Sequence, residues 1–181
     1  MNLFKQWIGR WLLENLKRKS ARQKVEFSSL KAVKSMAILM ELKAGDSLKP
    51  EALEKELSAL KIPYRILVIA DRGLAPAIDL EKWTFFSLNK SDVRSRPKEE
   101  SATDFLNQSF DLMLDLTTSN DLTVLLTAYR IKARFKAGLS TKLRQPYLNF
   151  MISGGETANG PIGLLKELLG YLQQIKRGYE G

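Results

Sequence analysis

The chain has 181 residues, of which 44% are hydrophobic and 27% charged, and its net charge is +9 at pH 7. That length favours one domain with enough residues to bury a core. The chain contains neither cysteine nor histidine, which excludes disulfides, zinc–thiolate sites, Ser-His-Asp triads and histidine bases. Any catalysis would have to use Asp, Glu, Lys, Arg, Tyr, Ser or Thr. The excess of positive charge favours an anionic partner.

Residues 1–24 are expected to form a basic amphipathic helix, followed by one α/β domain over residues 25–181. Large apolar side chains recur every three or four residues and form one stripe: Leu3, Phe4, Trp7, Ile8, Trp11, Leu12 and Leu16. The segment carries seven basic side chains against one acid, a net charge of +6. Charges interrupt this segment too often for a transmembrane span. A secretory signal has its positive charge before its apolar part, whereas here the positive charge follows the apolar part. We therefore expect a cytoplasmic protein.

Two main interpretations of this helix stay open. In the first, the apolar stripe packs on the chain's own domain or on a second copy of the chain. In the second, Phe4, Trp7 and Trp11 enter the headgroup region of a membrane, while Lys17 and Arg18 contact anionic lipid. That arrangement would hold the protein at the inner face of the membrane. Nucleic acid is a third partner for the basic face.

The first half of the domain alternates strands and helices. A strand is predicted over 36–42 (MAILMEL), a helix over 50–60 that begins with a proline and buries a leucine stripe, and a strand over 64–70 (YRILVIA). A short strand near 83–88 and a short helix near 101–108 follow. Strand, helix and strand in succession are typical of a parallel crossover unit.

The second half repeats this pattern over 110–140. A near-continuous apolar run at 110–116 predicts a central strand covered on both faces. A polar turn and a short helix follow, and basic residues then alternate with apolar ones from Arg130, which predicts another strand. A last strand is expected at 147–152 and a last helix at 161–175. Together the elements predict a single Rossmann-like domain, a mostly parallel sheet with helices on both faces.

In such sheets ligands bind at the carboxyl ends of the strands. The polar residues expected there include Asp71, Asp115, Thr117 and Thr118. Asp115 is the most informative, because a carboxylate inside an apolar strand needs a partner or a shifted pKa. It is either a ligand-binding or acid–base residue, or it orders the following turn by accepting hydrogen bonds from Thr117, Ser119 and backbone N–H groups.

The loop at 153–160 (SGGETANG) joins the last strand to the last helix. Gly154 and Gly155 would let backbone N–H groups approach a phosphate at the start of that helix. The spacing matches neither the P-loop nor the dinucleotide fingerprint, and Glu156 would repel an anion. The alternative is a plain flexible connection, and the sequence predicts no cofactor and no metal.

A row of basic residues marks the predicted strand after the short helix. Arg130, Lys132, Arg134 and Lys136 alternate with apolar residues, which would place four cations on one strand face. The row either contacts an anionic partner or is the solvated face of an edge strand, where such charges discourage aggregation.

The segments SMAILMEL, FDLMLDLTT, IKARFKAGL and LLKELLGYLQQIK together resemble an uncharacterised family of small bacterial α/β proteins. The resemblance spans nearly the whole chain and implies a fold and a bacterial cytoplasmic setting. Residues 110–138 are also similar to the N-terminal half of heptosyltransferase-like glycosyltransferases, with Asp111, Asp115, Ala133, Arg134 and Gly138 in comparable places. Those enzymes need a second Rossmann-like domain, for which 181 residues are too few.

The sequence is therefore interpreted as a non-catalytic binding or scaffolding module. Its contact surfaces would be the N-terminal helix and the basic row. The expected partner is another protein, a second copy of the chain, an anionic membrane surface or nucleic acid. The alternative is a small enzyme or ligand-binding domain for a phosphorylated or sugar substrate at the strand carboxyl ends.

Overall fold

A computed structural model describes residues 3–20, 27–43, 46, 49–70, 81–87, 99–153 and 160–175 of the chain. The helices are α1 (Leu3–Ser20), α2 (Pro50–Ala59), α3 (Glu100–Asn107), α4 (Leu122–Arg130) and α5 (Gly160–Gln174), with a short 3-10 helix η1 (Leu30–Ala32). The strands are β1 (Met36–Leu42), β2 (Tyr64–Ala70), β3 (Trp83–Ser87), β4 (Ser109–Asp115), β5 (Lys132–Leu139) and β6 (Phe150–Ile152).

The six strands form one sheet in the order β3-β2-β1-β4-β5-β6, and every pairing is parallel. This is the strand order of the doubly wound Rossmann fold. The apolar runs of β1, β2 and β4 occupy its centre, where both faces are covered. The predicted Rossmann-like architecture is confirmed, and the predicted bounds of β1 and β2 agree with the structure.

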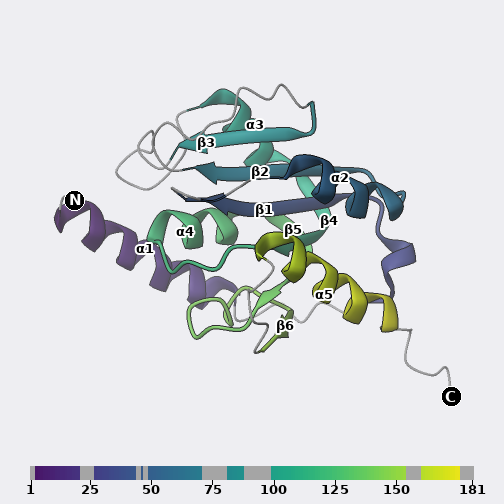
Figure 1. Ribbon diagram of the computed structural model, residues 1–181. Coiled ribbons are helices and arrows are strands. Elements are labelled where there is room, and N and C mark those ends of the chain that lie inside the picture. The colour runs from purple at the N-terminus through teal and green to yellow at the C-terminus, as the bar shows by residue number, and fades with distance from the viewer. Residues whose placement is uncertain are drawn as a thin grey trace, which may run out of the picture.

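Helices cover both faces of the sheet, as predicted (Figure 1). One core lies between the sheet and helices α2 and α5, which are in front of the strands in Figure 1. The second core lies on the other face, where α3, α4 and the middle of α1 contribute side chains. Right-handed crossovers of parallel strands produce this division into layers.

Local chemistry explains where α2 and α4 begin. Pro50 occupies the first turn of α2, where its missing N–H costs nothing, and Leu53 and Leu57 point into the core. Asp121 caps α4, because its carboxylate accepts hydrogen bonds from the backbone N–H groups of Thr123 and Val124, at 2.7 and 3.3 Å. The cap fixes the point at which the loop after β4 turns into the helix.

Two predicted boundaries in the second half are wrong by more than one residue. The last strand begins at Phe150 rather than at residue 147, because the backbone N–H groups of Tyr147 and Leu148 bond back to the carbonyl of Arg144 and close a turn. The strand predicted from Arg130 begins at Lys132, since α4 extends through Arg130. The strand that follows is not an edge strand: β5 pairs with β4 on one side and β6 on the other.

Candidate functional site

Asp115 lies at the carboxyl end of β4 and is completely buried. Its Oδ1 accepts hydrogen bonds from the backbone N–H and the hydroxyl of Thr117, at 3.0 and 2.6 Å. Its Oδ2 accepts a hydrogen bond from the Tyr147 hydroxyl at 2.5 Å and lies 3.5 Å from Nε of Arg144. The carboxylate thus orders the turn after β4, as one interpretation of the sequence predicted, although Ser119 is not among its partners.

Arg144 is the buried counter-charge that sequence reasoning missed. Its side chain is fully buried, and Nη2 donates to the Thr117 hydroxyl at 3.1 Å and to the Ser119 carbonyl at 2.5 Å. The sequence offered no reason to place Arg144 in the core, because an arginine in a polar turn gives no local sign of burial. A buried ion pair of this kind positions a turn rather than adding much net stability.

Lys136 and Tyr147 complete the buried polar cluster around Asp115. The Lys136 ammonium donates to the carbonyls of Ala128 and Tyr129, at 2.9 and 3.2 Å. Burial lowers the pKa of Lys136 to about 8, while the nearby Asp115 charge acts in the opposite direction. Burial, followed by the charge of Asp115, raises the pKa of the Tyr147 hydroxyl far above its usual value. At neutral pH the phenol therefore remains a hydrogen-bond donor to Asp115.

The strand order reverses between β1 and β4, which is where doubly wound sheets bind ligands. Glu41 of β1 occupies part of this position. Its Oε1 accepts hydrogen bonds from the backbone N–H groups of Thr118 and Ser119, at 2.7 and 2.6 Å, and lies 3.5 Å from the Lys43 ammonium. Burial alone would raise the pKa of Glu41, but these hydrogen bonds and the charge of Lys43 outweigh it and hold the pKa below its usual value.

The structure therefore brings together Asp115, Thr117 and Thr118 of the predicted ligand site, but joins them to Glu41 and Arg144. The backbone N–H groups that an anionic ligand would use bind an internal carboxylate instead. The Glu41 contact had a weak signal in the sequence, a second carboxylate near the end of a buried strand. Asp71, Gly154 and Gly155, which were also predicted to line the site, lie outside the described residues.

The predicted basic row does not exist as a row, because its four members have different surroundings. Arg130 ends α4, whereas Lys136 is buried against the last carbonyls of that helix. Lys132 is exposed and reaches the carbonyl of Asn107, the last residue of α3, at 3.4 Å. Cations are favoured at these helix ends because they complement the helix dipole.

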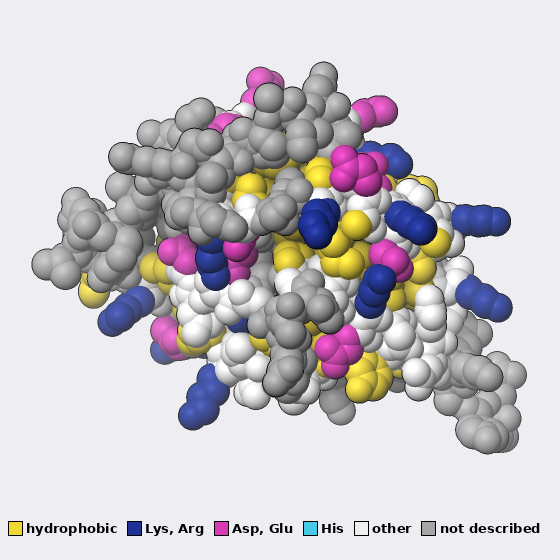
Figure 2. Space-filling view, viewed as in Figure 1, with side chains coloured by type: hydrophobic (Ala, Val, Ile, Leu, Met, Phe, Trp, Pro, Cys, Tyr) yellow, Lys and Arg dark blue, Asp and Glu magenta, His cyan; other side chains and the backbone are white. Residues whose placement is uncertain are grey.

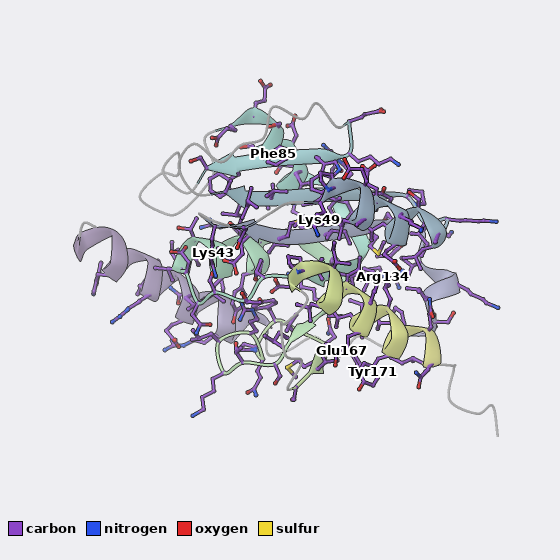
Figure 3. All side chains as sticks on the ribbon, viewed as in Figure 1. Lys43, Lys49, Phe85, Arg134, Glu167 and Tyr171 are labelled. Carbon is purple, nitrogen blue, oxygen red and sulfur yellow. The ribbon has the colours of Figure 1, made fainter. Side chains whose placement is uncertain are left out.

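Arg134, a further member of the predicted row, faces solvent. Its side chain is 80% exposed and its guanidinium lies 3.8 Å from the Asp111 carboxylate. Several Lys and Arg side chains project at the right of Figure 2, beside the starts of β1 and β2. Figure 3 shows Arg134 toward this side and Lys43 toward the opposite ends of the strands. Exposed positive charge therefore lies beside the strand starts and, at Lys43, beside the carboxyl end of β1 as well.

Helix α1 is anchored to the domain through one face. Leu13 is buried in the core beside α4, and Leu12 and Leu16 pack against the same core. Trp7 and Trp11, which the sequence placed on the same stripe, are 65% and 59% exposed. The stripe prediction is thus correct for the two leucines and wrong for the tryptophans, and it omitted Leu13.

The opposite face of α1 is the one that carries the tryptophans. At 3.6 residues per turn, Trp7, Trp11 and Arg18 fall within an arc of about 40°, and all three are exposed. For Phe4 and Lys17 the structure describes the backbone only. In Figure 1 the first half of α1 extends beyond the sheet and the other helices. Within the described ranges, no helix combines the length and the apolar character needed to cross a bilayer.

The fold and the buried cluster define a doubly wound parallel α/β domain whose switch-point N–H groups bind an internal carboxylate. The chain belongs to a family of unknown function (DUF6913), whose model matches residues 5–175. The predicted resemblance to an uncharacterised family is thereby confirmed. No curated protein matches the chain.

Among solved structures, the chain is similar to the glycosyl transferase family 9 protein from Veillonella parvula. The sequence identity is 13% and the TM-score is 0.49, and the match covers 80% of this chain. It covers 43% of that protein, so this chain spans less than half the length of the structure it matches.

Proposed function

We propose that this chain is a non-catalytic binding module that docks on an anionic membrane surface through the exposed tryptophans of α1. The observation that carries the proposal is the exposure of Trp7 and Trp11 on a helix whose opposite face is anchored by Leu13. The helix is therefore held in place by the domain while its aromatic face remains available. Tryptophan favours the boundary between lipid headgroups and acyl chains.

Charge favours an anionic lipid surface over a second copy of the chain. Residues 1–24 carry a net charge of +6, so contact between two such helices would bring like charges together. Juxtamembrane basic residues gain about 1 kcal/mol each near an anionic leaflet. Nucleic acid would satisfy the charge but would leave the tryptophan rings less completely covered. The membrane accounts for both features of the helix.

The alternative, a ligand or substrate site at the strand carboxyl ends, has less support. Asp115 has Thr117, Tyr147 and Arg144 as partners, and it is completely buried. An enzyme site needs polar groups that converge on a space open to substrate. Within the part of the chain that the structure describes, the convergent polar groups at this edge bind one another.

The test is cosedimentation of the full chain with vesicles of phosphatidylcholine, with and without phosphatidylglycerol. We expect binding to the anionic vesicles and a strong loss in the double variant Trp7→Ala, Trp11→Ala. Burying apolar area contributes about 25 cal/mol per Å², and a tryptophan offers roughly 150–250 Å². Each ring should therefore contribute at least about tenfold in affinity.

Tyr171→Ala provides the matched control, because Tyr171 is an exposed aromatic residue, at 48%, on a different helix. It should bind vesicles as the wild-type chain does. The double variant Arg10→Gln, Arg18→Gln should weaken binding to anionic vesicles and make the remaining binding less sensitive to salt, because fewer charges are left to be screened. Equal binding by the tryptophan and Tyr171 variants, or no wild-type binding to anionic vesicles, would refute the proposal.

A further inference from the structure

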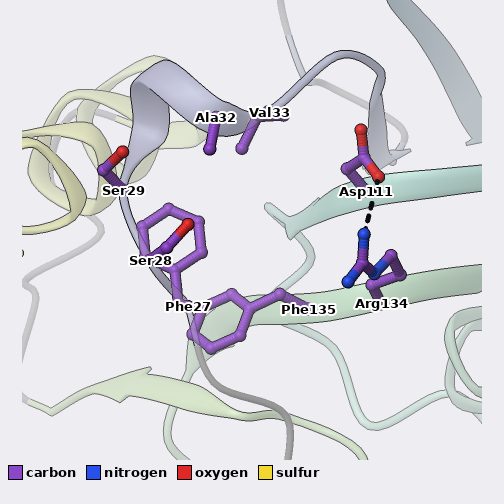
Figure 4. A pocket seen from close by; sticks show the side chains of 8 residues that line it. All are labelled: Phe27, Ser28, Ser29, Ala32, Val33, Asp111, Arg134 and Phe135. Atoms are coloured by element: carbon purple, nitrogen blue, oxygen red, sulfur yellow. Dashed lines mark ion pairs between the residues drawn. The ribbon is translucent and has the colours of Figure 1, made fainter. Parts of the chain in front are cut away.

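A small pocket lies at the edge of the sheet where the strands begin, opposite the predicted ligand edge. Its volume is about 100 Å³, and it lies between residues 27–33 and the starts of β4 and β5. Phe27 packs on Phe135 at its floor, with ring centroids 4.6 Å apart. Figure 4 shows Ser28 and Ser29 on one side and the Asp111–Arg134 ion pair on the other.

The walls of the pocket are fixed by bonds between distant parts of the chain. The backbone N–H of Lys34 donates to Oδ2 of Asp111 at 2.9 Å. In return, the backbone N–H of Asp111 donates to the carbonyl and hydroxyl of Ser35, at 3.1 and 3.2 Å. These bonds join the segment before β1 to the start of β4. The pocket therefore has a defined shape without any ligand.

The polar groups around the pocket are mostly hydrogen-bond donors with spare capacity. Asp111, at 3.8 Å, is the counter-ion of Arg134 among the described residues, and that distance is too long for a hydrogen bond. The Arg134 side chain is 80% exposed, and its guanidinium therefore keeps its planar set of N–H groups available. Ser29 precedes η1, yet its hydroxyl makes no capping hydrogen bond. An arginine and two serines thus surround a space that several water molecules would fill.

The charge around the mouth of the pocket favours an anion with more than one negative charge. Lys31 and Lys34 are exposed on the segment that forms one wall, and Lys132 is exposed two residues before Arg134. Asp111 is the one acidic residue among those that line the pocket, and its Oδ2 already accepts the Lys34 N–H. We propose that this pocket binds the phosphate group of a phosphomonoester.

A phosphate fits these donors better than a carboxylate does. Its three terminal oxygens can accept from the Arg134 guanidinium and from both serine hydroxyls, whereas a carboxylate has two oxygens. Arginine binds phosphate through two parallel N–H···O bonds, which also fix its orientation. The Phe27 and Phe135 rings offer an apolar surface to the organic part of the ligand. The phosphate belongs either to a soluble phosphomonoester or to a lipid such as phosphatidate.

The experiment is a titration of the ¹⁵N-labelled full chain with glycerol phosphate, inorganic phosphate and acetate, followed by amide chemical shifts. We expect saturable shifts at Ser28, Ser29 and Arg134 with the two phosphates and weaker binding of acetate. Arg134→Gln should reduce the affinity at least about tenfold, because hydrogen bonds between charged partners are removed. The double variant Ser28→Ala, Ser29→Ala should reduce it several-fold.

Lys142→Gln is the matched control, since it removes one positive charge from an exposed side chain in the turn after β5, at the end of that strand opposite the pocket, and should leave the affinity unchanged. Both charge variants should fold normally, because exposed charges contribute little to stability. Phosphatidate vesicles identify the lipid source if they compete with glycerol phosphate for the pocket. The proposal is overturned if no shifts saturate, if Arg134→Gln and Lys142→Gln bind phosphate alike, or if acetate binds as tightly as phosphate. Vesicle binding through α1 is independent, since Arg134→Gln should leave it intact.

Discussion

The release of the Lys136 proton in the folded chain should make this protein more stable in mildly alkaline solution than at neutral pH. Burial lowers the pKa of this lysine to about 8 from an ordinary value of 10.5. Between about pH 8 and pH 10.5, Lys136 has lost its proton in the folded chain but still holds it in the unfolded chain. Stability rises with pH wherever the unfolded state binds more protons. The free energy of unfolding should therefore increase across this window.

The size of the increase follows from the pKa difference. Each pKa unit corresponds to about 1.4 kcal/mol, so the whole window is worth about 3 kcal/mol, of which about 2 kcal/mol falls between roughly pH 7.5 and 9.5. Above about pH 10 the trend should reverse. Burial raises the pKa values of the Tyr129 and Tyr147 hydroxyls. The unfolded chain therefore loses these protons at a lower pH than the folded chain does, and the free energy of unfolding falls as the pH rises further.

The assay is urea unfolding of the wild type, Lys136→Met and Lys132→Met at about pH 7.5 and 9.5. Lys136→Met should abolish the increase, because the titrating group is gone. At neutral pH its net effect should be small. The variant leaves two carbonyls of α4 without their donor, which costs about 1–3 kcal/mol, but it also removes the cost of burying a charge.

Lys132→Met is the control, because Lys132 is exposed on the same strand, and this variant should show the wild-type increase. Wild-type stability that is flat or falls over this interval would refute the reasoning. So would an increase that survives in Lys136→Met.

Two further substitutions test the packing around Asp115. Arg144→Met should destabilise the fold by about 3–5 kcal/mol in urea unfolding, because it leaves a buried carboxylate without its cation; a loss below about 1 kcal/mol would show that Asp115 tolerates burial without the guanidinium. Gly138→Ala should cost about 1–3 kcal/mol and lower the melting temperature, since an added Cβ would lie 3.0 Å from both Cβ and the carbonyl oxygen of Asp115; an unchanged melting temperature would show that β5 shifts freely.

The sequence by itself determined the elements of the sheet and the class of fold. The apolar runs MAILMEL and YRILVIA span the strands that the structure contains. This worked because a strand buried on both faces must be apolar throughout, whatever else surrounds it. Alternation with helices then leaves few arrangements for the chain, since parallel strands need right-handed crossovers. Strand boundaries depend on the surrounding structure as well, and the strand after α4 begins two residues later than its basic pattern predicts.

The tertiary structure alone decided what the charged residues do. Arg134 and Lys136 lie two residues apart on β5, where the period-two pattern treats them alike, yet one is exposed and the other caps α4. Glu41 and Thr118 are separated by 77 residues and meet only because β1 and β4 are neighbours in the sheet. Hydrophobic periodicity is a local property and can be read from a short segment. The partner of a charge is set by strand order and helix placement, which no short segment contains.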